Sequence, residues 1–131
     1  MRVGLLIVTH GDIGQALLET ATGMLGLCPL RTQALGVRQD CEPQEILAQA
    51  HRLISDLDEG SGVLVLTDMY GSTPSNIAGA LRDTNVSVIA GLNLPMLVRV
   101  LNYPQLGLAE LAEKALSGGH DGVLPFESKV G

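Results

Sequence analysis

The chain has 131 residues, of which 46% are hydrophobic and 17% charged, which corresponds to one domain at about 150 residues per domain. This apolar content supports a packed core and excludes a disordered chain. Aromatic residues make up only 2%, so nucleic-acid binding through stacked bases is not expected. The net charge of −6 also argues against nucleic acid and anionic membranes, because their phosphates would repel the protein.

Other features of the composition predict a cytoplasmic protein. Cys28 and Cys41 match neither a zinc site nor a CxxC motif, and unpaired thiols are typical of a reducing compartment. The apolar run at 3–8 is short for a secretory signal, and no segment approaches the roughly 18 apolar residues of a membrane-spanning helix. Without repeats or linkers, residues 1–131 are expected to form a single domain.

Apolar runs and helical periodicities alternate along the chain. Continuous apolar runs predict buried strands, and apolar residues spaced three and four apart predict amphipathic helices. The expected strands are residues 3–8, 31–37, 63–66, 86–90 and 120–126. The expected helices are residues 12–25, 43–57, 73–81, 93–101 and 108–117.

Polar residues and glycines mark the ends of these helices. A polar side chain at the N-cap accepts a hydrogen bond from the first turn, and proline favours the first helical positions. Gly118 and Gly119 are expected to end the last helix before the terminal strand. The expected caps are Asp12 in a capping box with Gln15, Thr73 before Pro74, and Asn93.

The polarity of each strand predicts its place in the sheet. The strands at 3–8 and 63–66 are wholly apolar and belong in the centre, while the more polar strand at 31–37 belongs at an edge. These positions predict a doubly wound, mainly parallel α/β sheet with the flavodoxin-like order 2-1-3-4. The strand at 86–90 is apolar for an open edge, so the terminal strand is expected to cover it, from this chain or from a partner's.

This strand order brings two strand ends to one crevice. Ligands of such sheets bind beyond the carboxyl ends of the strands, at the switch point, where His10 and Asp68 would meet. A neutral imidazole offers one nitrogen to phosphorus, a metal or a proton, and a carboxylate can hold the other nitrogen. We therefore predict His10 as the catalytic nucleophile and Asp68 as the residue that orients it.

The backbone around this pair is suited to an anion. The helices beginning near Asp12 and Thr73 would direct their N-termini at the crevice, where amide hydrogens and the helix dipole favour phosphate. No metal and no cofactor are expected, because no two histidines have metal-ligand spacing and no dinucleotide or P-loop motif occurs. The candidate phosphoryl-binding residues are Gly11, Gly71, Ser72 and Thr73.

Three motifs together are similar to those of a known family. They are VTHG at 8–11, LTD with GSTPSN at 66–76, and VIAGLNLPM at 88–96. In order and spacing they resemble the mannose-family IIA component of the phosphoenolpyruvate-dependent sugar phosphotransferase system. The resemblance extends from about residue 2 to residue 126.

The resemblance implies a function and a set of partners. It implies that His10 accepts a phosphoryl group from the histidine phosphocarrier protein and passes it to a IIB component for sugar uptake, with Asp68 holding the histidine. It also implies a cytoplasmic homodimer formed by exchange of the terminal strand, with only peripheral contact to the membrane components IIC and IID. Because no IIB domain follows the IIA region, the acceptor is expected to be a separate protein.

One turn departs from the family pattern. The usual Gly-Gly-Ser-Pro is replaced by the sequence at 71–74, in which Thr73 keeps a hydroxyl at the position of the phosphoryl-binding serine. Ser72 replaces a glycine, which matters if the turn requires a positive φ there. Met69 offers no hydroxyl. These changes bear on the transfer rate and on the preferred donor.

Two other functions are compatible with these residues. One is a regulatory binding protein whose partner interactions depend on phosphorylation of His10, without direct sugar transport. The other is a receiver-like domain phosphorylated on Asp68, which is disfavoured because the first strand ends in Thr9 and His10 rather than in paired acids that hold magnesium.

Overall fold

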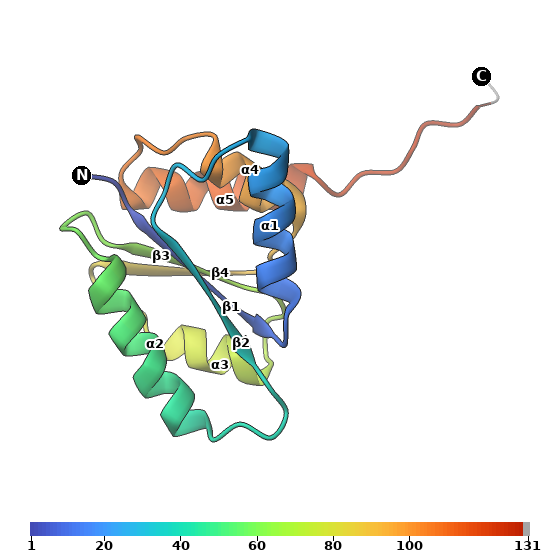
Figure 1. Ribbon diagram of the computed structural model, residues 1–131. Helices are drawn as coiled ribbons and strands as arrows, with labels where there is room; N and C mark the ends of the chain where they lie inside the picture. The colour runs from blue at the N-terminus through green and yellow to red at the C-terminus, as the bar shows by residue number, and fades with distance from the viewer. Residues whose placement is uncertain (130–131) are drawn as a thin grey trace.

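The computed structural model describes residues 1–129, which form a four-stranded parallel sheet with helices on both faces (Figure 1). The sheet order is β2-β1-β3-β4, which confirms the predicted doubly wound, flavodoxin-like fold. The strands are β1 (Gly4–His10), β2 (Thr32–Val37), β3 (Val63–Thr67) and β4 (Val86–Ala90). The helices are α1 (Ile13–Leu25), α2 (Pro43–Leu57), α3 (Thr73–Ala80), α4 (Leu94–Leu101) and α5 (Leu108–Asp121).

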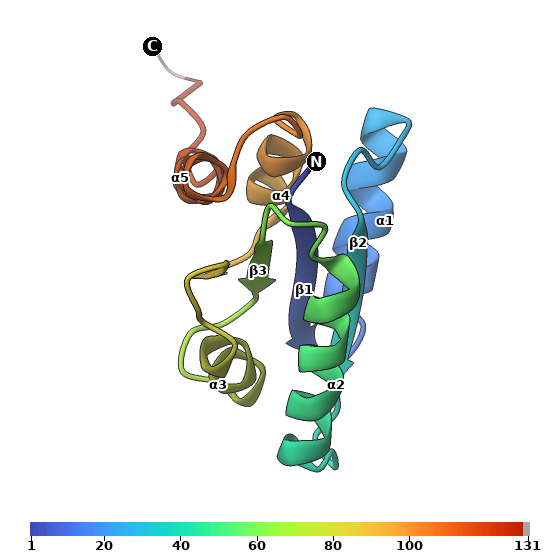
Figure 2. The same ribbon diagram turned by 90° about the vertical axis from the view of Figure 1, so that its left-hand side faces the viewer.

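The two central strands are buried because helices cover both faces of the sheet. Leu5 and Ile7 of β1 pack in a cluster with α1, α4 and α5, whereas Leu6 and Val8 pack in a second cluster with α2 and α3. Figure 2 shows these two helical layers on opposite sides of the sheet. The alternation of side chains thus explains why β1 is apolar at successive positions, and β2 lies at an edge as predicted.

The start of α1 differs from the predicted capping box. Asp12 occupies the N-cap position but makes no capping hydrogen bond, since its φ of −96° and ψ of 9° lie outside the extended conformation typical of an N-cap. Its carboxylate pairs with Arg38 at 3.0 Å. The Oγ1 of Thr9 instead accepts a hydrogen bond from the Gly14 N–H at 2.8 Å. Gln15 donates to Glu19 at 3.0 Å rather than reaching back to the cap.

The caps of α3 and α4 are both side-chain oxygens. Ser72 rather than Thr73 caps α3, since the Ser72 Oγ accepts from the Ser75 N–H at 3.4 Å and Thr73 is the first helical residue. The predicted cap of α4 is confirmed, because the Asn93 Oδ1 accepts from the Met96 N–H at 2.9 Å.

The predicted end of the last helix is wrong. Helix α5 continues through Gly118 and Gly119, both of which are buried against α4. A Cβ on Gly118 would lie 2.7 Å from the Arg99 Cβ, and one on Gly119 would lie 2.7 Å from the Met96 Cε. The two glycines therefore allow close helix packing rather than helix termination.

The predicted terminal strand is also absent from the described residues. His120 lies within α5, and 122–129 form no strand but extend away from the rest of the molecule (Figure 1). The outer edge of β4 accordingly has no strand beside it within residues 1–129. None of the helices in this part of the chain combines the length and apolar character needed to cross a membrane.

Candidate functional site

His10 and Asp68 meet at the carboxyl ends of β1 and β3, as their positions in the sequence predict. The His10 Nδ1 lies 2.9 Å from the Asp68 Oδ2, and the His10 backbone N–H donates to the same oxygen at 3.0 Å. The other carboxylate oxygen of Asp68 accepts a hydrogen bond from the Met69 N–H at 3.0 Å. The side chain of His10 is 43% exposed and that of Asp68 only 12%.

These contacts determine which ring nitrogen of His10 is available. A carboxylate only accepts hydrogen bonds, so the proton of the neutral ring lies on Nδ1 and the lone pair on Nε2 is left for a reacting group. Burial raises the pKa of Asp68, but hydrogen bonds from the His10 ring and from the N–H groups of His10 and Met69 outweigh burial and lower that pKa below its ordinary value. Asp68 therefore remains ionised beside the ring.

His10 lines two hollows on the surface. The first, here called the Thr73 hollow, has a volume of about 290 Å³ and is also lined by Arg38, Cys41 and Thr73. The second, the Asp12 hollow, measures about 610 Å³ and includes Gly11 and Asp12, again with Arg38. Of the four candidate phosphoryl-binding residues, Gly11 and Thr73 thus line hollows shared with His10.

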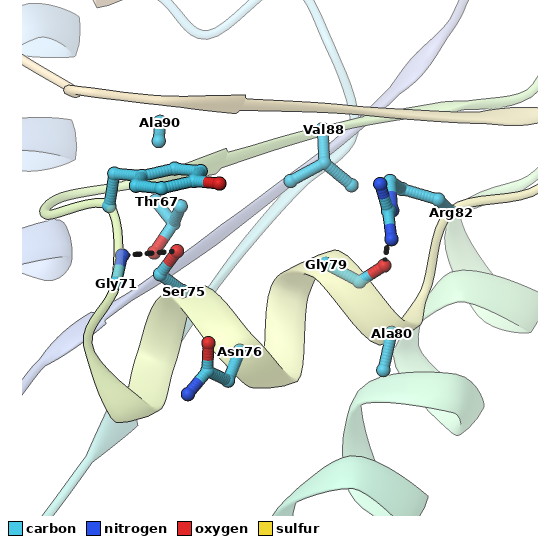
Figure 3. A pocket seen from close by; sticks show the side chains of 10 residues that line it. Thr67, Gly71, Ser75, Asn76, Gly79, Ala80, Arg82, Val88 and Ala90 are labelled. Carbon is cyan, nitrogen blue, oxygen red and sulfur yellow. Dashed lines mark hydrogen bonds between the residues drawn. The ribbon is translucent and has the colours of Figure 1, made fainter.

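The other two candidates have different surroundings. Gly71 lines a separate hollow of about 600 Å³ beside β4, here called the edge hollow, and its N–H donates to the Ser75 Oγ at 3.3 Å. Figure 3 shows Gly71 with Thr67 and Ser75 at one end of this hollow and Arg82 at the other. The Ser72 hydroxyl donates to the Met69 carbonyl at 2.6 Å, so the turn itself uses this group.

The turn requires a positive φ at Gly71 and not at Ser72. Gly71 has a φ of 84°, whereas Ser72 has a φ of −94° and a ψ of 171°, which any residue can adopt. The replacement of the second glycine of the family pattern by Ser72 therefore places no strain on the backbone, and the hydroxyl that it adds caps α3.

Sequence reasoning missed two residues of this region, Thr9 and Arg38. Thr9 is buried, and its hydrogen bond connects the end of β1 to the first turn of α1. The signal in the sequence was a polar residue at the end of an apolar strand. Arg38 directly follows Val37, which is the register partner of His10 in β2. Its place at the carboxyl end of the predicted edge strand was the signal in that case.

The arrangement suits nucleophilic chemistry. The Nε2 of a neutral imidazole whose side chain is 43% exposed can attack phosphorus, and the ionised Asp68 would stabilise the positive charge that develops on the ring. Within residues 1–129 no group of three His, Cys, Asp or Glu side chains is arranged to hold a metal ion.

Known proteins are similar to this chain in sequence and fold. The family model described as "PTS system fructose IIA component" matches residues 4–116. The chain is 31% identical to the "PTS system mannose-specific EIIAB component" of Escherichia coli (strain K12), over 98% of this chain but only 41% of that protein. It is 32% identical to the "PTS system fructose-specific EIIA component" of Bacillus subtilis (strain 168), over 88% of this chain and 82% of that protein.

The fold comparison agrees. A solved structure of the mannose/sorbose specific IIA subunit of the phosphotransferase system from Enterococcus faecalis has a TM-score of 0.86, with 23% identity and coverage of 98% of this chain and 97% of that one. The family match covers most of the chain, and the Bacillus relative is covered over most of its own length. The chain therefore belongs to the mannose-family IIA components of the phosphoenolpyruvate-dependent sugar phosphotransferase system.

Proposed function

We propose that this protein is a phosphocarrier that takes a phosphoryl group on His10 from the histidine phosphocarrier protein and passes it to a separate IIB component for sugar uptake. The observation that carries this proposal is the contact between the His10 Nδ1 and the Asp68 Oδ2 at 2.9 Å, which leaves the lone pair on Nε2 for a reacting group. Membership in the IIA family supports the same role.

The exposure of His10 favours protein partners over a small substrate. Its side chain is 43% exposed and borders two open hollows, so the imidazole of another protein can approach it. An enclosed pocket would be needed to bury a small molecule, which buries most of its surface when bound. Donor and acceptor are therefore both proteins, and the sugar does not contact this chain.

The transfer is written as two displacements at phosphorus. The His10 Nε2 forms a bond to phosphorus as the bond to the donor's nitrogen breaks, and the donor imidazole keeps the electron pair. Nδ1 retains its proton, and the carboxylate of Asp68 stabilises the resulting charge on the ring. In the second step the nucleophile of the IIB component attacks phosphorus, and Nε2 leaves with the electron pair.

The further elements of this proposal are location and assembly. The protein acts in the cytoplasm without a cofactor, and any contact with the membrane is peripheral, through the components IIC and IID. It forms a homodimer in which the C-terminal segment of each chain covers the β4 edge of the other. The open edge of β4 and the exposed apolar side chains of 122–129 support this assembly.

Phosphorylation in a reconstituted system tests the proposal. Incubation with phosphoenolpyruvate, enzyme I and the phosphocarrier should place one acid-labile phosphate on the parent protein. His10→Ala should remove the label, whereas His120→Ala, which changes an exposed histidine on α5, should keep it. Asp68→Asn should slow phosphorylation by roughly 10- to 100-fold, because the acceptor of the ring hydrogen bond loses the charge that stabilises the transition state.

Two results would contradict the proposal. Label on His10→Ala at the parent level would exclude His10 as the acceptor. Label that survives acid but is lost in hydroxylamine would indicate an acyl phosphate, as expected for a receiver-like domain phosphorylated on Asp68.

A further inference from the structure

Arg38 lies beside His10 at the end of the neighbouring strand. Val37 is the register partner of His10, and the Gly11 N–H donates to the Val37 carbonyl at 3.0 Å, so the next residue of β2 extends over the turn that follows β1. The Arg38 Nη1 is the nearest atom, at 3.9 Å, to the position of a Cβ on Gly11. The guanidinium therefore lies over the backbone next to the reacting histidine.

Arg38 is the only lysine or arginine that lines either of the hollows containing His10, as far as the described residues go. The carboxylates of Asp12 and Asp40 also border the Asp12 hollow, and Asp68 is hydrogen bonded to the ring. A phosphoryl group on Nε2 adds about two negative charges to this acidic surrounding. Without Arg38, no lysine or arginine among residues 1–129 would line these hollows to offset them.

The present partner of Arg38 holds it only weakly. The Arg38 Nη2 lies 3.0 Å from the Asp12 Oδ1, and the two side chains are 64% and 82% exposed. Ion pairs this exposed to water contribute little, because water screens the charges and ordering long side chains costs entropy. Asp12 makes no capping hydrogen bond in addition, so the pair can separate without disturbing α1.

We propose that Arg38 binds the phosphoryl group on His10, and that Asp12 holds its guanidinium while His10 is unphosphorylated. This proposal rests on the proposed function, since it requires phosphorylation of His10. A guanidinium can donate two parallel N–H groups to two oxygens of a phosphoryl group. The more highly charged phosphoryl group should therefore bind Arg38 more strongly than the exposed carboxylate of Asp12 does. Arg38 thus exchanges a monoanion for a dianion at each phosphorylation.

The equilibrium of phosphoryl transfer from the phosphocarrier measures this interaction. The equilibrium constant depends only on the free energies of the separated phosphorylated and unphosphorylated proteins, so it does not report how well the partners dock. Arg38→Gln should shift the equilibrium toward the phosphocarrier by about tenfold. Asp12→Asn should shift it the other way, because it removes both a negative charge and the competitor for Arg38.

If the two residues formed only a structural ion pair, Arg38→Gln and Asp12→Asn would both break it and would have similar effects. Shifts of the equilibrium in opposite directions therefore indicate phosphoryl binding by Arg38. Arg31→Gln is the matched control, because it removes the same charge just before β2, at the far end of that strand, and should leave the equilibrium unchanged. Arg38→Lys keeps the charge but cannot donate two parallel N–H groups, so its equilibrium constant should lie between those of the parent and Arg38→Gln. Thermal unfolding checks that each variant is folded.

Distinct results would overturn this inference and the proposed function. If the parent is phosphorylated on His10 and Arg38→Gln behaves as Arg31→Gln does, the role of Arg38 is excluded and the phosphocarrier function stands. The same holds if Asp12→Asn shifts the equilibrium in the direction of Arg38→Gln. A parent protein that takes no phosphate on His10 overturns both.

Discussion

Asp68 is held in the site by several hydrogen bonds. Its two oxygens accept three hydrogen bonds, from the His10 ring, the His10 N–H and the Met69 N–H, at 2.9 to 3.0 Å. These bonds outweigh the effect of burial, so the pKa of Asp68 lies below its ordinary value. Because the carboxylate is more acidic in the folded state, its ionised form stabilises the fold.

Asp68→Asn should therefore change how stability depends on pH. Above the ordinary value of 3.8, the parent should exceed the variant in free energy of unfolding by about 1–3 kcal/mol, since the carboxylate accepts charge-assisted hydrogen bonds. This advantage should shrink as the pH falls below 3.8 through the lower pKa of the folded state, where Asp68 becomes protonated. Urea unfolding between pH 3 and 7 measures the difference.

The exposed Asp121 provides the control for this titration. Its hydrogen bond with Arg99 lowers its pKa, but water surrounds it, so Asp121→Asn should alter stability less than Asp68→Asn at pH 7. A difference between the parent and Asp68→Asn that stays constant down to pH 3 would contradict the role assigned to Asp68.

At this scale the sequence predicted that His10 and Asp68 meet, but not all of their neighbours. His10 and Asp68 end two central parallel strands, so topology alone brings them together. Ser72 was considered for phosphoryl binding, and the structure uses its hydroxyl as a helix cap. The choice between a capping bond and a free hydroxyl depends on local backbone angles, which the residue type does not determine.

At the scale of the elements, α4 and α5 pack closely where α5 carries Gly118 and Gly119. The Asn93 Nδ2 donates to the Gly119 carbonyl at 3.0 Å and ties the start of α4 to α5. Gly118→Ala should destabilise the protein by about 1–3 kcal/mol, because the added methyl would lie 2.7 Å from the Arg99 Cβ, which is attached to the α4 backbone and cannot rotate away. Chemical denaturation measures this cost.

Gly23→Ala is the matched comparison on another helix. Gly23 lies within α1, and a Cβ there meets no atom within 4 Å. Alanine should therefore stabilise the protein by about 0.5–1 kcal/mol, through the lower entropy of the unfolded chain and its higher helix propensity. Equal effects of the two substitutions would show that close packing does not explain Gly118.

The order of the elements was predictable, whereas the end of α5 was not. Burial on both faces makes the central strands continuously apolar, so their places follow from composition. Paired glycines are typical of a helix end and equally of a close helix contact, and only the neighbouring α4 decides between these at Gly118 and Gly119. The predicted strand at 120–126 was wrong because α5 takes up its first two residues and 122–126 pair with no strand within residues 1–129.

At the scale of the whole molecule, β4 has no strand beside its outer edge within residues 1–129, and one segment carries exposed apolar side chains. β4 has an open outer edge, with Val88 and Ala90 lining the edge hollow. The segment 122–129 leaves the molecule as an extended chain (Figure 1) and carries exposed apolar side chains, of which Phe126 is fully exposed. An open edge and exposed apolar residues both favour association with a second copy.

Phe126→Ser should therefore weaken a homodimer. Burying a phenylalanine contributes about 1.5–3 kcal/mol, and a symmetric dimer contains the contact twice, so the dissociation constant should rise by about 100-fold or more. Sedimentation equilibrium of the parent and the variant measures this change. Leu27→Ser is the control, because Leu27 is 61% exposed between α1 and β2, away from β4, and its loss should leave the dissociation constant unchanged. A parent that remains monomeric at tens of micromolar, or equal constants for the two variants, would exclude assembly through the C-terminal segment.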